Sequence, residues 1–185
     1  MPFVSSDIAL TLRSIGLRPA MLAVLFAVAG CAGEDKFPPA CPELTLLPDA
    51  ADLSRFRPSG RDITDMVLDA KITAVPAQCS RPNAQTVVAK MNVNFAVSRG
   101  PAAVGRSAAL QYFVGVTEGG RVLDEQDYQI GVAFPSNIDT VALSGEEITL
   151  NFPVNPQQSA EAYRIYVGFR LTPEQLAANR ARGTR

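Results

Sequence analysis

The most constraining feature of this chain is an alternation of apolar and polar residues along positions 89–98, where the sequence is AKMNVNFAVS. Every second residue from Ala89 to Val97 is apolar, and Lys90 and Asn92 lie between them. Successive side chains of a β-strand point to opposite faces, so this pattern predicts a strand with one face in a core and the other in water. The segment Arg99-Gly100-Pro101 is expected to end it.

The same period recurs on both sides of this segment. Residues 66–75 place four apolar side chains on one face: Leu68, Ala70, Ile72 and Ala74. Residues 163–171 do the same with Tyr163, Ile165, Val167, Phe169 and Leu171. Shorter candidate strands lie at 44–47, 138–143 and 147–154. Each of these runs predicts a strand of a sheet with a buried face.

A hairpin is predicted around Glu118-Gly119-Gly120, which separates the strand-like segments 108–116 and 121–134. A two-residue Gly-Gly turn would set Val114 opposite Glu125, a poor match. We therefore expect a three-residue loop with Gly120 in the left-handed conformation, which shifts the register by one. The shared apolar face then holds Leu110, Tyr112, Val114, Val116, Val122, Tyr128 and Ile130. A second irregularity is expected near 124–127.

Together these segments predict an all-β fold of six to seven strands over residues 43–171. Short connections without helices favour an antiparallel β-sandwich of the immunoglobulin or fibronectin kind. A small barrel with an internal cavity is the alternative. Residues 172–185 predict a short C-terminal helix, because Thr172 suits the N-cap, Pro173 the first turn and Gln175 a capping box.

Composition excludes several function classes. The chain of 185 residues has a net charge of −1, so nothing in it points to nucleic acid. It contains no histidine, which removes the commonest general base and metal ligand. No nucleotide-binding fingerprint or other cofactor motif is present, and no cofactor is predicted. We therefore expect a protein that is not an enzyme, with a carboxylate-only hydrolase as the minor alternative.

The N-terminal segment has the three parts of an export signal. Arg13 and Arg18 precede an apolar run over residues 20–29, which is too short to cross a bilayer. Small residues and Cys31 follow this run. Val28-Ala29-Gly30-Cys31 resembles a lipobox, and residues 1–31 are similar to the signal region of bacterial lipoprotein precursors, although Asp7 lies in an unusually long first part. The rest of the chain resembles no family that we recognise.

The resemblance implies that cleavage falls between Gly30 and Cys31 and that Cys31 carries the lipid. Residues 1–30 would then be the signal peptide and 31–42 a short tether, placing the domain on a lipid bilayer of the bacterial cell envelope. Ala32 stands where an aspartate is associated with inner-membrane retention, so the resemblance implies the outer membrane, facing the periplasm. An ordinary secretory signal and an apolar first helix with a buried cysteine are the alternatives.

Two further cysteines remain once Cys31 is assigned to lipid. Cys41 and Cys79 would oxidise to a disulfide outside the cytoplasm. Two buried thiols are the alternative. A metal site is disfavoured because no CxxC motif or histidine accompanies either residue.

Three arginines, Arg55, Arg57 and Arg61, lie around Pro58-Ser59-Gly60. They could contact an anionic lipid headgroup or an acidic partner, or pair with nearby aspartates. Two acidic groups are weaker candidates for chemistry. Asp62, Asp65 and Asp69 form the first group, a possible calcium site. Asp124, Glu125 and Asp127 form the second, which could supply a pair of carboxylates for hydrolysis. Solvent-exposed or capping roles are expected for both.

These observations predict a membrane-anchored envelope lipoprotein whose sandwich is a protein-interaction or assembly module, with an envelope protein as partner. The alternative is a periplasmic lipoprotein that binds a small molecule or lipid in a barrel cavity. The packing of the domain interior distinguishes the two functions. Small residues such as Ala70, Ala74 and Ala89 would either leave a ligand cavity or allow the facing sheets to pack closely.

Overall fold

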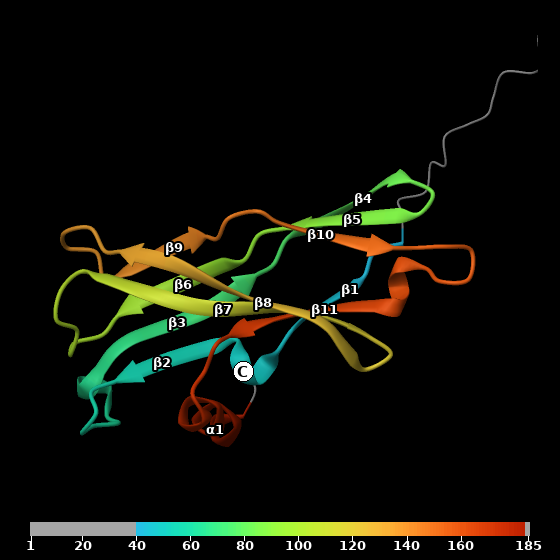
Figure 1. Cartoon of the computed structure of the whole chain (residues 1–185). Helices are drawn as coiled ribbons and strands as arrows, with labels where there is room; N and C mark the ends of the chain where they lie inside the picture. Colours follow the sequence, from blue (N-terminus) through green and yellow to red (C-terminus); the bar gives the residue numbers. More distant parts are fainter. Residues whose placement is uncertain (1–39, 184–185) are drawn as a thin grey trace, which may run out of the picture. The chain divides into compact units, whose positions relative to one another are not determined.

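The computed structural model describes residues 40–183, which form a β-sandwich with one α-helix (Figure 1). The strands are β1 (Glu43–Leu46), β2 (Asp52–Phe56), β3 (Met66–Ala74), β4 (Ala77–Asn83), β5 (Thr86–Met91), β6 (Asn94–Arg99), β7 (Ser107–Glu118), β8 (Arg121–Ala133), β9 (Thr140–Ser144), β10 (Ile148–Pro153) and β11 (Tyr163–Phe169). The helices are the 3-10 turns η1 (Pro48–Ala50), η2 (Ile63–Asp65) and η3 (Ala160–Ala162), and the α-helix α1 (Pro173–Arg182).

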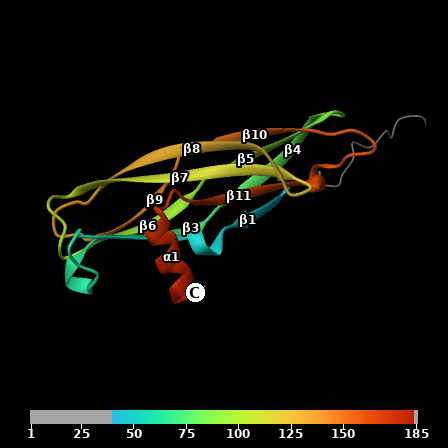
Figure 2. The same cartoon turned by 60° about the horizontal axis from the view of Figure 1, so that its bottom comes forward.

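Two layers make up the sandwich (Figure 2). One is a sheet of order β1-β11-β7-β8, and the other consists of β2-β3-β6-β9 continued by β10-β5-β4. All strand pairs are antiparallel except β1 with β11, which is parallel. The predicted antiparallel sandwich is confirmed. The alternative of a small barrel is wrong, because the sheets end in edge strands and do not close.

Eleven strands are present instead of the predicted six to seven, because β2 and β4 lie outside the predicted strands and a seam in the second layer divides the predicted strand at 89–98 into β5 and β6. At this seam β3 gives way to β4, β5 to β6 and β9 to β10. The three interruptions lie side by side: the Asn92 amide nitrogen donates to the Pro76 carbonyl at 3.2 Å, and its side chain donates to the Gly145 carbonyl at 3.1 Å. Pro76 lacks the amide hydrogen that a continuous ladder needs. The three strand paths β3–β4, β5–β6 and β9–β10 are therefore interrupted at the same place in the layer.

The strand order departs from that of the immunoglobulin fold. There the second and third strands lie in opposite sheets. In this chain the second path, β3 and β4, pairs directly with the third, β5 and β6, in one layer. The β1-η1-β2 path crosses between the layers, so that β1 joins β11 and β2 joins β3.

The core lies between the layers and is filled by the alternating residues. Ala89, Met91, Val93, Phe95 and Val97 are all buried, as predicted. Tyr163, Ile165, Val167 and Phe169 are buried opposite them, and Leu171 is half-buried. Ala70 and Ala89 pack within this cluster, but Ala74 is exposed, contrary to the predicted pattern. The register of β3 against β6 shifts between Ile72 and Ala74, which takes Ala74 off the core face.

The β7–β8 hairpin corrects the predicted turn. Glu118 pairs with Arg121, so the loop has two residues, and both Gly119 (φ 56°) and Gly120 (φ 84°) are left-handed. Two positive φ angles define the turn that matches the twist of a hairpin. The expected register shift comes instead from a bulge between Val116 and Thr117. Beyond the bulge Tyr112 pairs with Tyr128 and Leu110 with Ile130, as predicted, whereas Val122 pairs with Thr117 away from the core face.

Candidate functional site

An open groove of about 740 Å³ lies between β2, the loop after it and helix α1. Three cationic side chains line it: Arg55, Arg61 and Arg182. Its apolar lining comes from Phe56, Pro58, Ala178 and Ala181. Glu174 is the one carboxylate on its wall. A groove with this lining suits a ligand that carries negative charge beside apolar groups.

The Arg55 side chain of β2 is held by a hydrogen bond to the opposite layer. Its Nη1 donates to the carbonyl oxygen of Ala109 in β7 at 2.8 Å. The pairing of β11 with β7 ends at Tyr112, so Ala109 has no partner strand on that side. The Arg55 guanidinium supplies the hydrogen-bond donor that a neighbouring strand would otherwise give. Partial burial lowers the pKa of the Arg55 guanidinium, because desolvation disfavours its charge.

Helix α1 forms the opposite wall and begins as predicted. Thr172 accepts a hydrogen bond from the Gln175 amide at 3.3 Å, and the Gln175 side chain accepts one from the Thr172 amide at 2.9 Å, which completes the capping box. The buried Asn179 then donates its side-chain amide to the carbonyls of Asp49 (2.8 Å) and Asp52 (2.7 Å). These contacts fix the helix against η1 and β2.

Sequence reasoning missed the contribution of the helix to the groove. Arg182 donates to the Ser54 hydroxyl at 3.4 Å and also to the Asn179 side-chain oxygen. The Ser54 hydroxyl in turn donates to Asp69 at 2.8 Å. Ser54 and Arg182 are 128 positions apart. No local pattern marks such a contact, because its two residues meet only in the folded chain.

Of the three arginines singled out in the sequence, the structure brings two to the groove. Arg55 and Arg61 line it, whereas Arg57 is exposed in the loop and is not part of the lining. Within residues 40–183, none of the three has a carboxylate oxygen within 4.0 Å. Pairing with local aspartates, the alternative raised by the sequence, is therefore not seen in this part of the chain.

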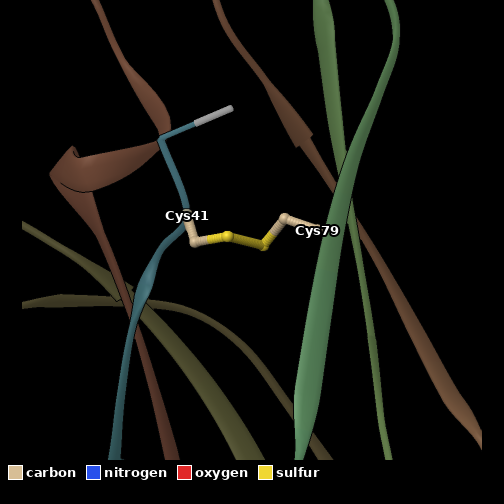
Figure 3. Close-up of a disulfide and its surroundings, with 2 residues drawn as sticks. All are labelled: Cys41 and Cys79. Atoms are coloured by element: carbon tan, nitrogen blue, oxygen red, sulfur yellow. A yellow bond between two sulfur atoms is a disulfide. The ribbon is translucent and has the colours of Figure 1, made fainter. Parts of the chain in front are cut away.

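Cys41 and Cys79 form a disulfide, with their Cα atoms 6.0 Å apart (Figure 3). Cys41 precedes β1 in one layer and Cys79 lies in β4 of the other, so the bond ties the two layers together. Cys31 and Gly30, the predicted lipidation and cleavage residues, lie outside the described residues.

The acidic group at 124–127 has structural partners. Glu125 and Asp127 both form ion pairs with Arg170, whose guanidinium also lies 4.7 Å from the Phe113 ring centroid. The Asp124 side chain accepts from the Glu125 amide at 2.9 Å. Among residues 40–183 no cluster of three or more acidic or cysteine side chains is arranged to hold a metal ion. Within the same range, no helix has the length and apolar character to span a bilayer.

No protein-family model, curated protein or solved structure matches this chain. The candidate site is therefore defined by the structure alone. The structure is an all-β sandwich domain with a cationic groove along the edge strand β2.

Proposed function

We propose that this protein is a non-enzymatic lipoprotein of the bacterial cell envelope, anchored through acylated Cys31, whose sandwich docks a partner protein in the groove between β2 and α1. The order of charge, apolar run, small residues and Cys31 supports the anchor. The Cys41–Cys79 disulfide supports an oxidising compartment, because such bonds are rare in the cytoplasm.

One observation carries the docking role. Arg55, Arg61 and Arg182 converge on one groove, and within residues 40–183 none of them forms a salt bridge. Arg55 is the partly buried one of the three, and burying a cation without a counter-charge is costly, so an incoming carboxylate offsets that cost. The partner segment is therefore acidic, with apolar groups to cover Phe56 and Pro58.

The lack of histidine and the structural pairing of Glu125 and Asp127 favour binding over catalysis. An anchor in the cell envelope would put the partner in the periplasm or in the outer membrane, which is the membrane that the resemblance to lipoproteins implies for Cys31. A lipid-carrier role is not proposed, because it depended on a closed barrel.

Two measurements test this function in native cells. Intact mass and membrane fractionation, with Cys31→Ser as control, should show acyl mass on a chain that begins at Cys31. Soluble, unmodified protein would overturn the anchor. A photo-crosslinker at Ala178, which lines the groove, should capture one envelope protein, whereas the same probe at the neighbouring exposed Ala177 should not. Equal capture at both positions would argue against the groove.

A further inference from the structure

Two large apolar side chains are exposed at the tip of the β7–β8 hairpin. Val122 is 61% exposed and Leu123 is 43% exposed. Their neighbours from Arg121 to Asp127 in β8 are charged or polar and are also exposed. Two adjacent apolar residues exposed in this charged and polar part of β8 do not contribute to the core, so their exposure points to a contact with a ligand.

Strand register places this tip at the end of the sandwich where the chain enters from Cys31. Glu43, two residues after Cys41, pairs with Arg164. Arg164 pairs with Thr117, and Thr117 pairs with Val122. Three strand spacings separate Glu43 from Val122, or about 15 Å. Figure 1 shows the start of β1 and the β7–β8 turn at the same end.

The disulfide fixes this arrangement. Because Cys41 is bonded to Cys79 in the other layer, the entry point of the chain cannot peel away from the sandwich. The segment from Cys31 to Cys41 is short, with a reach of at most about 35 Å when fully extended. A lipid on Cys31 would hold this end of the sandwich within that distance of the bilayer surface.

We propose that the β7–β8 hairpin tip inserts Val122 and Leu123 into the interface of the phospholipid bilayer beside the lipid anchor. Arg121 follows the turn, with a side chain that is 77% exposed and only a 3.8 Å contact to Glu118, and it meets the headgroup phosphates. The inference rests on the proposed anchoring of Cys31.

The hairpin contact would also orient the domain. Met66, which pairs with Phe56 in the groove lining, and Cys79 lie at opposite parts of the β3–β4 path, about 40 Å apart along the strands. The loops between β2 and β3, β6 and β7, and β8 and β9 lie at the end far from the hairpin tip (Figure 2). With the tip on the bilayer, the groove is held away from the membrane and open to a periplasmic partner.

The chain has no tryptophan, so one introduced tryptophan is a clean reporter of lipid contact. Acylated mature protein, residues 31–185, carrying Val122→Trp would be reconstituted in phosphatidylethanolamine–phosphatidylglycerol vesicles with brominated acyl chains. We expect blue-shifted emission that the bromines quench to a small fraction of its value in unbrominated vesicles. Val104→Trp is the matched control, because Val104 is 96% exposed in the β6–β7 loop at the far end. It should emit as in water and stay unquenched.

The outcomes separate the two proposals. Acyl mass on Cys31 with no quenching at Val122→Trp or at Leu123→Trp overturns the hairpin contact and leaves the anchor standing. Equal quenching at the Val104→Trp control also overturns it. Blue-shifted emission without bromine quenching would mean that the tip is covered by protein, which again contradicts lipid contact. Absence of acyl mass overturns both proposals.

Discussion

Asn179 in the C-terminal helix donates its side-chain amide to the backbone carbonyl of Asp52 at 2.7 Å, across 127 positions of sequence. The same amide nitrogen donates to the carbonyl of Asp49 at 2.8 Å. One buried side chain thus satisfies one backbone acceptor in η1 and one at the start of the edge strand β2, and holds the helix there. Edge strands need such cover, because their unpaired backbone groups invite pairing with other chains.

Asn179→Ala should lower the free energy of unfolding by about 1–3 kcal/mol, because both carbonyls lose their donor in a partly buried place. Urea denaturation followed by circular dichroism would measure the change. Arg180→Ala is the control: it removes only an exposed ion pair with Asp49 at 3.0 Å, and such pairs contribute ~0–1 kcal/mol. A larger loss for Arg180→Ala than for Asn179→Ala would contradict this account.

Removal of the disulfide should lower the free energy of unfolding more than Asn179→Ala does. Cys41 and Cys79 are 38 positions apart, and closing a loop of that length restricts the unfolded chain by about 4 kcal/mol. Cys79→Ser should lower the denaturation midpoint accordingly, and the double Cys41→Ser/Cys79→Ser variant should lower it no further. Reduction of the unaltered protein with dithiothreitol should reproduce the shift, and a reduced protein of unchanged stability would refute it.

Local pattern was enough to predict much of this fold. The alternation from Ala89 to Val97 defined buried positions that the structure confirms, and the Thr172–Gln175 capping box marked the start of α1. Both features are local, since side-chain period and capping depend on residues a few positions apart. The Cys41–Cys79 disulfide was likewise predicted, because only these two of the three cysteines remain once Cys31 is assigned to lipid.

Long-range contacts explain what the sequence did not predict. The seam that splits three strands joins Pro76, Asn92 and Gly145, which become neighbours only in the assembled sheet. The groove needs α1 to dock on β2 through Asn179, a contact between the two ends of the domain. The hairpin was misjudged because a two-residue turn followed by a bulge gives the same register beyond the bulge as the longer loop.

The seam makes Gly145 sensitive to substitution. A Cβ at Gly145 would lie 2.7 Å from the Tyr112 hydroxyl oxygen, and Tyr112 is buried between Phe95 and Tyr128, with ring centroids 5.1 Å and 5.3 Å away. Gly145→Ala should therefore cost about 1–3 kcal/mol of stability through overpacking. Adding Tyr112→Phe should recover most of that loss in a double-mutant cycle. At Gly131 a Cβ would meet nothing within 4 Å, so Gly131→Ala should be close to neutral.

Alkaline pH should destabilise the protein through the same tyrosine. Burial raises the pKa of Tyr112, and Tyr128 and Glu146 raise it further. Above about pH 10 the unfolded chain releases this phenolic proton while the folded chain retains it, so the free energy of unfolding falls as pH rises. Below that pH both states keep the proton and this group gives no pH dependence. Chemical denaturation between pH 8 and pH 11, a range chosen to bracket a tyrosine pKa of about 10, should show a shallower fall for Tyr112→Phe.

Charge reversal at Arg61 gives the sharpest test of the groove. Arg61→Glu places a carboxylate beside Glu174, so an acidic partner segment loses an attraction and meets a repulsion. Affinity for the partner captured through Ala178 should fall roughly tenfold, or about 1.4 kcal/mol, and the binding that remains should depend less on salt. Arg57→Glu introduces the same charge change in the same loop but outside the groove lining, so its effect should be much smaller. Stability should be unchanged in both variants, because both side chains are exposed. Equal losses for the two variants would mean that general surface charge, and not the groove, attracts the partner.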